Sequence, residues 1–360
     1  MKKKLLFFGY TLDVGGAEKV MVDLVNVLKK DYDIDIALLK AQGDFLGAVP
    51  EGVNIIELRK DVFSYTLFRY VPFFRKRKIN KLANSKDYYA AIGFIEGRSA
   101  TWVADIKKNI RKIAWIHTDV NLFDIGISKE EAVDSYSKMD KVVFVAETSK
   151  DNFIQKYGVA NDTAEVLHNL IDEERIIELS KISVTSNDKF TFVNVGRMSP
   201  PKRQDRLVKA AKLLKDDGLN FKIQIVGAGS EESAIKAMIS EYGVSDCVDL
   251  LGLQTNPYPY VRQADCFVLS SDIEGYCVAV KESLLLGTPV IATNVSGIKE
   301  ELCDGKYGII CDVNTNSLYK AMKSVLLSDS ILDNFRKDLQ NYDCANGVIL
   351  EKLYAIIERN

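Results

Sequence analysis

The sequence contains few of the residues that build metal centres. Its only histidines are His117 and His168, so a histidine-rich metal site is nearly excluded. The six cysteines all lie in the C-terminal third of the chain and form no C-x-x-C pair. We expect them to be small buried side chains, and not disulfide partners or zinc ligands.

Long apolar runs are also missing. No stretch approaches the roughly 18 to 20 apolar residues that a membrane-spanning helix needs. Residues 1–9 lack the apolar region and the cleavage site of a signal peptide. The formal net charge of −2 provides no overall attraction to nucleic acid. We therefore expect a cytoplasmic protein without a nucleic-acid partner, and any membrane contact would be peripheral, on the inner face of the cell membrane.

Short apolar segments predict the fold. They alternate with helical or loop stretches, and such alternation indicates mostly parallel, doubly wound α/β sheets. A first series of strands is expected at residues 3–9, 34–39, 53–58, 90–95, 113–117, 142–146 and 164–167. A second series is expected at residues 190–195, 222–226, 248–251, 266–269, 289–292 and 308–311.

The two series indicate two Rossmann-like domains. We expect the first over residues 1–180 and the second over residues 181–340, joined by the polar segment 180–189. A C-terminal helix within residues 341–360 is expected to pack back on the first domain. Because ligands bind such sheets at the C-terminal ends of their strands, the two domains would face each other across a cleft.

Residues 265–297 contain the densest pattern in the chain. The apolar run from Cys266 to Leu269 predicts a buried strand, and Tyr276 to Leu286 predicts a helix. Glu274 falls in the loop between them, and Glu282 lies about two turns into the helix. Free N–H groups at a helix N-terminus bind anions, and a carboxylate beside them can bind hydroxyl groups. A sugar attached to a diphosphate has both kinds of group.

Two cations follow the first strand of the second series. Arg197 and Lys202 come shortly after Val195, where the strand is expected to end. In that position they could neutralise a diphosphate, or they could be ordinary surface charges.

Glycines follow three of the predicted strands. Gly15 and Gly16 stand at a strand-to-helix turn, which could be an ordinary turn or a loop that lets phosphate approach the backbone. Gly196 precedes the first of the two cations. Gly227 and Gly229 end another strand, but a third glycine is lacking, so they do not form a dinucleotide-binding fingerprint.

The segment from Arg69 to Lys86 is strongly basic. It holds seven lysines and arginines and no acidic residue before Lys86, and Tyr70, Phe73 and Phe74 are interleaved with them. Such a segment could bind the surface of an anionic bilayer, form a solvated helix face or contact nucleic acid.

Taken together, these motifs resemble the family-4 glycosyltransferases, which have the two-domain GT-B fold. The resemblance covers most of the chain and is densest from Val193 to Gly297. Its most specific part is the E-x7-E element of Glu274 and Glu282, with the trailing Gly-Thr-Pro-Val-Ile-Ala-Thr. The N-terminal half matches more loosely, as expected for a domain that recognises a variable acceptor.

The resemblance implies a role for each candidate residue. Arg197 and Lys202 would hold the diphosphate of a nucleotide-sugar donor, with Gly16 and the amides after Gly275 completing the cradle. Glu274 would face hydroxyls of the donor sugar, Glu282 the ribose, and the segment around Leu251 the base. The catalytic candidates are His117, Arg197, Lys202 and Glu274, and the donor-binding candidates are Gly15, Gly16, Gly196, Arg197, Lys202, Gly227, Leu251, Glu274, Gly275, Tyr276, Cys277, Val278 and Glu282.

The resemblance also implies the reaction. We expect transfer of a hexosyl or N-acetylhexosaminyl group, preferably from a UDP-sugar, with retention at the anomeric carbon and without a metal or other cofactor. The acceptor would be a saccharide, in particular a lipid-linked one, used in surface polysaccharide or glycolipid synthesis. The basic segment would then dock on the anionic cytoplasmic leaflet, and the contact residues expected there are Arg75, Lys76, Arg77 and Lys78.

Other functions remain open on the sequence alone. The chain could be a catalytically idle nucleotide-sugar-binding subunit, although its donor motifs are intact. GT-B proteins also include sugar-nucleotide epimerases, which need no acceptor, and phosphorylases, which need no nucleotide. The sequence does not indicate the oligomeric state.

Overall fold

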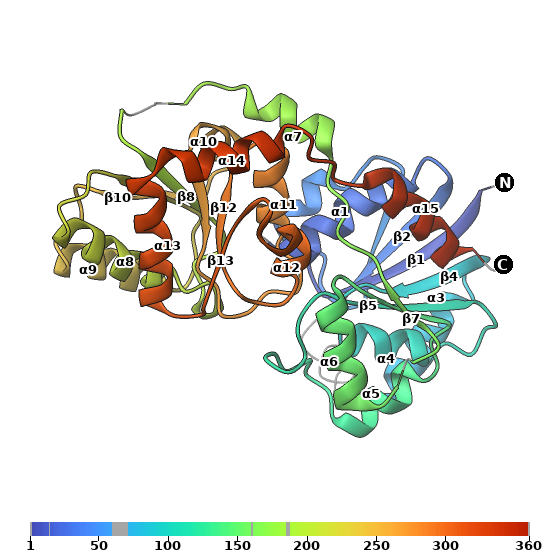
Figure 1. The fold of residues 1–360 in the computed structure, drawn as a ribbon. Coiled ribbons are helices and arrows are strands. Elements are labelled where there is room, and N and C mark those ends of the chain that lie inside the picture. The colour runs from blue at the N-terminus through green and yellow to red at the C-terminus, as the bar shows by residue number, and fades with distance from the viewer. Residues whose placement is uncertain (1, 14, 60–70, 160, 185–187, 359–360) are drawn as a thin grey trace. The chain divides into compact units, whose positions relative to one another are not determined.

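The computed structural model describes residues 2–13, 15–59, 71–159, 161–184 and 188–358 (Figure 1). It divides the chain into two compact units. The first comprises Met1–Leu170 together with Asn346–Asn360, and the second comprises Ile171–Ala345. Each unit is an α/β domain built on one sheet, and each is described by itself.

The first unit contains a sheet of seven strands in the order β3-β2-β1-β4-β5-β6-β7. Every neighbouring pair is parallel. Its central strands are buried on both faces, which explains why they read as continuous apolar runs. The strands are β1 (Lys3–Gly9), β2 (Tyr32–Leu38), β3 (Asn54–Glu57), β4 (Tyr88–Gly93), β5 (Arg111–Ile116), β6 (Lys141–Phe144) and β7 (Ala164–Val166).

Helices connect these strands. They are α1 (Gly16–Leu28), the 3-10 helix η1 (Asp44–Ala48), α3 (Pro72–Ala83), α4 (Arg98–Ala104), α5 (Lys129–Tyr136), α6 (Glu147–Tyr157) and the C-terminal α15 (Asn346–Ile357). One large core cluster of the unit includes Trp102 and Tyr136 from α4 and α5 and Phe144 from β6. Aromatic packing of this size is a large share of the apolar area that the unit buries.

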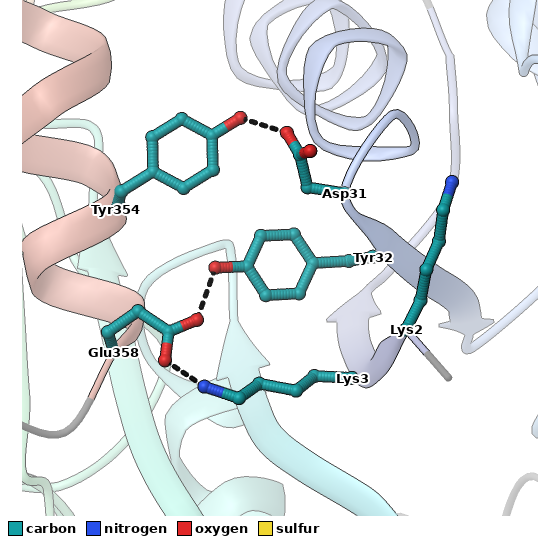
Figure 2. Close-up of a pocket in the computed structure, with 6 residues that line it drawn as sticks. All are labelled: Lys2, Lys3, Asp31, Tyr32, Tyr354 and Glu358. Carbon is teal, nitrogen blue, oxygen red and sulfur yellow. Dashed lines mark hydrogen bonds and ion pairs between the residues drawn. The ribbon is translucent and has the colours of Figure 1, made fainter.

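The last described residues, up to Glu358, are tied to the first strands of this unit. Glu358 forms an ion pair with Lys3 and accepts a hydrogen bond of 2.7 Å from Tyr32 (Figure 2). Tyr354 donates to Asp31 over 2.6 Å. These residues line a pocket beside the N-terminal ends of β1 and β2, at the edge of the sheet opposite to the one where ligands of such folds bind.

The second unit contains a six-stranded parallel sheet in the order β10-β9-β8-β11-β12-β13. Counted within the unit this is the order 3-2-1-4-5-6 of dinucleotide-binding Rossmann folds, and the first sheet begins with the same order. The strands are β8 (Thr191–Val195), β9 (Lys222–Val226), β10 (Val248–Gly252), β11 (Cys266–Leu269), β12 (Val290–Thr293) and β13 (Gly308–Cys311).

Helices cover both faces of this sheet as well (Figure 1). They are α7 (Glu173–Ser180), η2 (Pro200–Lys202), α8 (Gln204–Asp216), α9 (Glu232–Glu241), α10 (Tyr258–Gln263), α11 (Val278–Leu285), α12 (Ile298–Glu301), η3 (Cys303–Gly305), α13 (Thr315–Leu327) and α14 (Asp329–Leu339).

The predicted strands are all found among the described residues, with boundaries that differ by at most a few positions. The boundary between the units differs from the expected one. It lies between Leu170 and Ile171, because α7 packs on α10 and α11 of the second unit. Asn256 donates to the carbonyl of Leu179 and Arg262 to the hydroxyl of Ser180, which holds α7 in place.

Two further expectations need correction. Four of the six cysteines are buried, but Cys303 is exposed and Cys311 is partly exposed; all six have free thiols. Helix α11 begins at Val278 and not at Tyr276, because Cys277 is extended (φ −84°, ψ 100°) and acts as its N-cap.

No helix of the described residues is long and apolar enough to cross a bilayer.

Candidate functional site

Lys202 and Glu274 meet at the C-terminal edge of the second sheet. Lys202 ends η2, after β8, and Glu274 lies in the loop between β11 and α11. The Lys202 ammonium is 2.7 Å from Oε1 of Glu274 and 2.8 Å from Oε2. Ser271 donates a further hydrogen bond of 2.6 Å to Oε1. The carboxylate, which is 9% exposed, is therefore held in a defined orientation.

The contact with Glu274 keeps Lys202 protonated. Burial lowers the pKa of Lys202, but attraction to Glu274 and the hydrogen bond between them outweigh it, so the pKa is raised above its ordinary value. The positive charge of Arg197 acts on Lys202 in the opposite sense. Lys202 is therefore a cation at neutral pH, with the exposed Arg197 as a second cation close to it.

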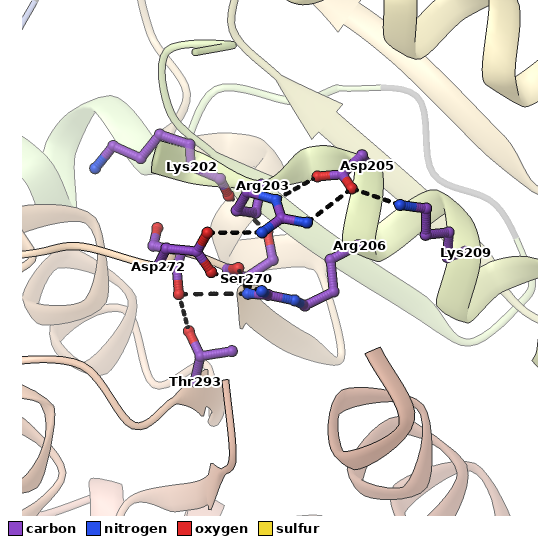
Figure 3. Close-up of polar contacts among 9 residues, drawn as sticks. Lys202, Arg203, Asp205, Arg206, Lys209, Ser270, Asp272 and Thr293 are labelled. Atoms are coloured by element: carbon purple, nitrogen blue, oxygen red, sulfur yellow. Dashed lines mark hydrogen bonds and ion pairs between the residues drawn. The ribbon is translucent and has the colours of Figure 1, made fainter. Parts of the chain in front are cut away.

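A network of ion pairs fixes the loop that carries Glu274 (Figure 3). Asp272 accepts hydrogen bonds of 2.6 Å from Arg203 and from Arg206. Arg206, which is 3% exposed, also donates to the carbonyl of Ser270, and the Ser270 hydroxyl donates to the carbonyl of Lys202 over 2.9 Å. The start of α8 is thereby tied to the loop after β11. Sequence analysis did not identify these residues, although Arg203 directly follows Lys202.

The loop that contains Gly227 and Gly229 packs against the loop that carries Arg197. Gly196 donates its backbone N–H to Val226, and a Cβ on Gly227 would lie 2.0 Å from the Gly196 carbonyl oxygen. Gly229 is equally constrained, because a Cβ on Gly229 would lie 2.2 Å from the carbonyl oxygen of Met198. Close packing of two loops is thus a sufficient reason for Gly227 and Gly229.

Gly15 and Gly16 stand at the N-terminus of α1, as the sequence predicts. Gly15 is the N-cap residue and is extended, with φ −168°, so it is not strained. A Cβ on Gly16, the first helical residue, would meet no atom within 4 Å. The helix N-terminus at Gly16 therefore has space beside its backbone, on the ligand-binding edge of the first sheet.

Helix α11 carries the second glutamate of the E-x7-E element. Because α11 begins at Val278, Glu282 lies just over one turn into the helix, and not two. Glu282 is 6% exposed and accepts a hydrogen bond of 3.1 Å from the hydroxyl of Tyr258 on α10. Leu251 lies near the end of β10, half-buried, and its carbonyl accepts a hydrogen bond from Gln254.

One amide of the expected phosphate cradle has a partner within the protein. The backbone N–H of Cys277 donates a hydrogen bond of 2.9 Å to Oε2 of Glu301. Glu301, at the end of α12, was not identified from the sequence and is 3% exposed. Gly275 and Tyr276 lie in the loop just before this amide, and Val278 begins the helix just after it.

In the first unit, His117 directly follows β5. Burial lowers the pKa of its imidazole to about 3, against a hydrogen bond with the backbone of Phe94. The Nε2 atom is buried and has no partner among the described residues, so the bond to Phe94 involves Nδ1. The ring is therefore neutral, with Nδ1–H as the donor and a lone pair on Nε2.

Glu96, after β4, is the second buried polar group beside His117. It accepts the backbone N–H of His117 over 3.0 Å and is 9% exposed. Burial raises its pKa, against the hydrogen bond from His117. Sequence analysis missed Glu96; its position just after a strand was the available signal.

The basic segment is only partly a charged surface. Arg69 and Tyr70 lie outside the described residues. Arg75, expected to be exposed, is 9% exposed and pairs with Asp105 at 2.8 Å, so its charge is not presented to a membrane. It is also 3.7 Å from Glu131. The prediction for Arg75 is therefore wrong.

The neighbours of Arg75 on α3 behave differently. Lys76 and Arg77 are exposed, although Lys76 lies 3.6 Å from Asp105. Lys78 is half-buried and donates to the carbonyl of Leu58. Two large apolar side chains, Phe73 and Phe74, are 68% and 46% exposed at the start of the helix.

Comparison with known proteins supports the assignment of both units. Residues 14–175 match the model of Glycosyltransferase Family 4, and residues 176–343 match that of Glycosyl transferases group 1. A Campylobacter jejuni N-acetylgalactosamine-N,N'-diacetylbacillosaminyl-diphospho-undecaprenol 4-alpha-N-acetylgalactosaminyltransferase is 27% identical, over 91% of this chain and 92% of its own length. A second enzyme of that organism, a GalNAc-alpha-(1->4)-GalNAc-alpha-(1->3)-diNAcBac-PP-undecaprenol alpha-1,4-N-acetyl-D-galactosaminyltransferase, is 25% identical, over 94% and 92%.

Solved structures share the whole fold at low identity. Anabaena Alr3699/HepE, crystallised with UDP, has a TM-score of 0.76 at 18% identity, over 99% of this chain and 100% of that one. TarM has a TM-score of 0.78 at 16% identity, over 100% and 99%. The two Rossmann-like units are thus those of the GT-B fold, and the chain belongs to the group 1 glycosyltransferases of family 4.

Proposed function

We propose that the protein transfers a hexosyl or N-acetylhexosaminyl group from a UDP-sugar to a lipid-linked saccharide, with retention and without a metal ion. The observation that carries this proposal is the contact between Lys202 and Glu274. It places a cation, suited to phosphate, beside a carboxylate, suited to sugar hydroxyls, at the C-terminal edge of a Rossmann-like sheet.

The diphosphate would bind where the positive charges lie. Lys202 is protonated at neutral pH, and Arg197 is near enough to act on its pKa. When phosphate oxygens arrive, Lys202 would be shared between them and Glu274, and Arg197 would supply the second charge. Fixed cations of this kind stabilise the negative charge that develops on a departing nucleoside diphosphate.

Glu274 is then placed for the sugar, and not for the phosphate. Its oxygens accept two hydrogen bonds from Lys202 and one from Ser271, which leaves a lone pair on Oε2 for a sugar hydroxyl. Glu282 would bind the ribose from α11, oriented by Tyr258. With both carboxylates used in this way, neither is a glycosidase-type nucleophile. Retention would follow from attack on the face that the diphosphate leaves.

His117 would contribute as a neutral group. The unpartnered Nε2 lone pair can accept a hydrogen bond from a hydroxyl of the donor sugar or of the acceptor. Its hydrogen bond to Phe94 fixes the tautomer in which this lone pair exists.

The choice of UDP and of a lipid-linked acceptor rests on relatives. The Anabaena protein was also solved with UDP-glucose, and the two Campylobacter enzymes are named as N-acetylgalactosaminyltransferases with undecaprenol-diphosphate saccharides in their names. These similarities support a UDP-sugar donor and a lipid-linked acceptor for this chain.

Membrane contact through α3 would bring the enzyme to such an acceptor. Phe73 and Phe74 are exposed beside Lys76 and Arg77, a combination that suits the interface of an anionic bilayer. Replacing these four residues with Ser should reduce sedimentation with anionic liposomes. A variant with Lys29 and Lys30 replaced removes two exposed cations elsewhere in the unit and serves as the control. Equal sedimentation of both variants and wild type would contradict the contact.

The proposed function is tested by measuring the binding of nucleotide-sugar donors and the transfer of their sugar to an acceptor or to water. Wild-type protein, with EDTA present, is titrated with UDP-, GDP- and ADP-sugars and then incubated with undecaprenyl-diphosphate saccharides. We expect metal-independent binding of a UDP-sugar that weakens at least tenfold in Lys202→Ala and Glu274→Gln, and α-linked product from an α-linked donor. Binding of no nucleotide sugar would refute the proposal.

A further inference from the structure

Helix α12 is built directly against the loop that carries Glu274. Its N-cap, Gly297, has φ +79°, and a Cβ there would lie 2.5 Å from the carbonyl oxygen of Gly275 and 3.2 Å from Cα of Tyr276. Only glycine permits this approach of two backbones. Helix α12 therefore begins beside the loop that carries Glu274.

Glu301 is the last residue of this helix. Its Oε2 atom accepts the backbone N–H of Cys277 over 2.9 Å, and its Oε1 atom is buried without a hydrogen-bond partner among the described residues. Within the same residues no cation lies at ion-pair distance from this carboxyl, which is 3% exposed. An ionised carboxylate with one oxygen desolvated and unpaired is strongly disfavoured.

The surroundings favour a neutral carboxylic acid. Burial raises the pKa of Glu301 well above its ordinary value, the hydrogen bond from Cys277 opposes this, and the charge of Glu274 adds to it. The titratable and charged groups that act on Glu301 or feel its charge are Glu274, Tyr276, Cys277, Lys281, Glu300 and Tyr342. Of these, Lys281 is the one cation, and burial lowers its own pKa.

A neutral acid at this place has a specific consequence for anion binding. Cys277 is the N-cap of α11, so the amides that follow it form the helix N-terminus that would receive phosphate. An ionised carboxylate bonded there would compete with the phosphate and repel it. A neutral carboxyl can hold the loop without doing so.

We propose that Glu301 is a positioning residue for the donor diphosphate. As a neutral carboxylic acid it holds the Cys277 amide and fixes the loop between Glu274 and Glu282, without bringing negative charge to the phosphates. This inference rests on the proposed function, and it adds a residue and a protonation state that the family motifs do not include.

The test compares UDP with uridine, because uridine has no phosphate. Binding of each is measured on the full chain by calorimetry or ligand-observed NMR from pH 7 to pH 9.5. The variants are Glu301→Gln, which reproduces a neutral carboxyl, and Glu301→Ala, which removes it. Asp304→Asn is the control, since it removes an exposed carboxylate three residues away. Thermal unfolding confirms that each variant is folded.

At pH 7 we expect Glu301→Gln and Asp304→Asn to bind UDP within about threefold of wild type, and Glu301→Ala to bind it roughly tenfold more weakly, with uridine binding changed less than twofold. Where the pH is high enough to ionise Glu301, wild type should lose affinity for UDP relative to Glu301→Gln, since only wild type can ionise at this position.

Three results would overturn the inference. Glu301→Gln could weaken UDP binding as much as Glu301→Ala, which would mean that the charge is needed. Glu301→Ala could weaken uridine and UDP equally, which would mean a general structural role. Glu301→Gln could bind UDP clearly more tightly than wild type at pH 7, which would mean that Glu301 is already ionised there. If wild type bound no UDP at all, the proposed function would fail together with this inference.

Discussion

Arg206 donates a hydrogen bond of 2.6 Å to Asp272 and thereby joins the first turn of α8 to the loop after β11. Arg203 reaches the other oxygen of the same carboxylate over 2.6 Å. The pair of bonds spans two segments that are more than sixty residues apart in the chain. It sets the position of the loop on which Glu274 meets Lys202.

Asp272→Asn should weaken donor binding without abolishing folding. Loss of two charge-assisted hydrogen bonds loosens the loop before Glu274, and we expect KM for the donor to rise about tenfold. Asp205→Asn is the matched control, because Asp205 pairs with Arg203 and Lys209 but not with the loop. Initial rates over a range of donor concentrations measure the effect. An equal rise in both variants would show that Asp272 does not act through the loop.

Arg203→Gly should be more stable than Arg203→Ala. Both variants lose the ion pairs of Arg203, but this residue has φ 52° and ψ 43°, the left-handed conformation that glycine adopts without strain. We expect glycine to be favoured by about 1 kcal/mol in free energy of unfolding. Urea denaturation of the two variants makes the comparison. An alanine variant as stable as the glycine one would show that the conformation relaxes.

His117→Gln should make the stability of the protein depend less on pH between pH 4 and pH 7. The pKa of His117 is lowered to about 3 in the folded protein, whereas an unfolded histidine titrates near 6.5. The unfolded chain therefore binds an extra proton between these values. The stability that the neutral ring confers is complete above about pH 6.5 and is lost as the pH falls towards 3. Melting temperatures from pH 4 to pH 7 should fall less steeply in the variant than in wild type.

Glu358→Gln should loosen α15 from the first unit. Burial raises the pKa of Glu358, but its bonds to Lys3, Tyr32 and Tyr89 outweigh burial and lower it. A lowered carboxyl pKa stabilises the fold above the unfolded value of about 4.3, and this contribution is lost as the pH falls.

We expect this substitution to lower the melting temperature at pH 7 by roughly 1–3 °C, a small effect because the ion pair is partly exposed. Glu351→Gln, which changes an exposed carboxylate on α15, serves as the control. A larger loss in the control than in Glu358→Gln would contradict the anchoring role.

The parallel sheets could be predicted from the sequence because their strands are buried on both faces. A run such as Cys266 to Leu269 is apolar at every position, whichever neighbours it finds. Glycine and charge at the ends of these runs then indicated the ligand edge, where Lys202 and Glu274 do lie together. These signals are local, since each is carried by a few adjacent residues.

Two features depended on the tertiary structure alone. In the sequence Arg75 resembles its basic neighbours. In the structure it pairs with Asp105, which lies thirty residues later in the chain. Glu301 looks like a surface glutamate of a short helix, yet the approach of Gly297 to Gly275 buries it against the Cys277 amide.

The sequence by itself therefore determined the two sheets, the family motifs and the ligand-binding edge, because buried strands and turns are indicated by the types of a few adjacent residues. Only the tertiary structure decided which charges are paired, neutral or exposed. The charge state of a side chain depends on desolvation and on partners brought together from distant segments, and no local pattern contains that information.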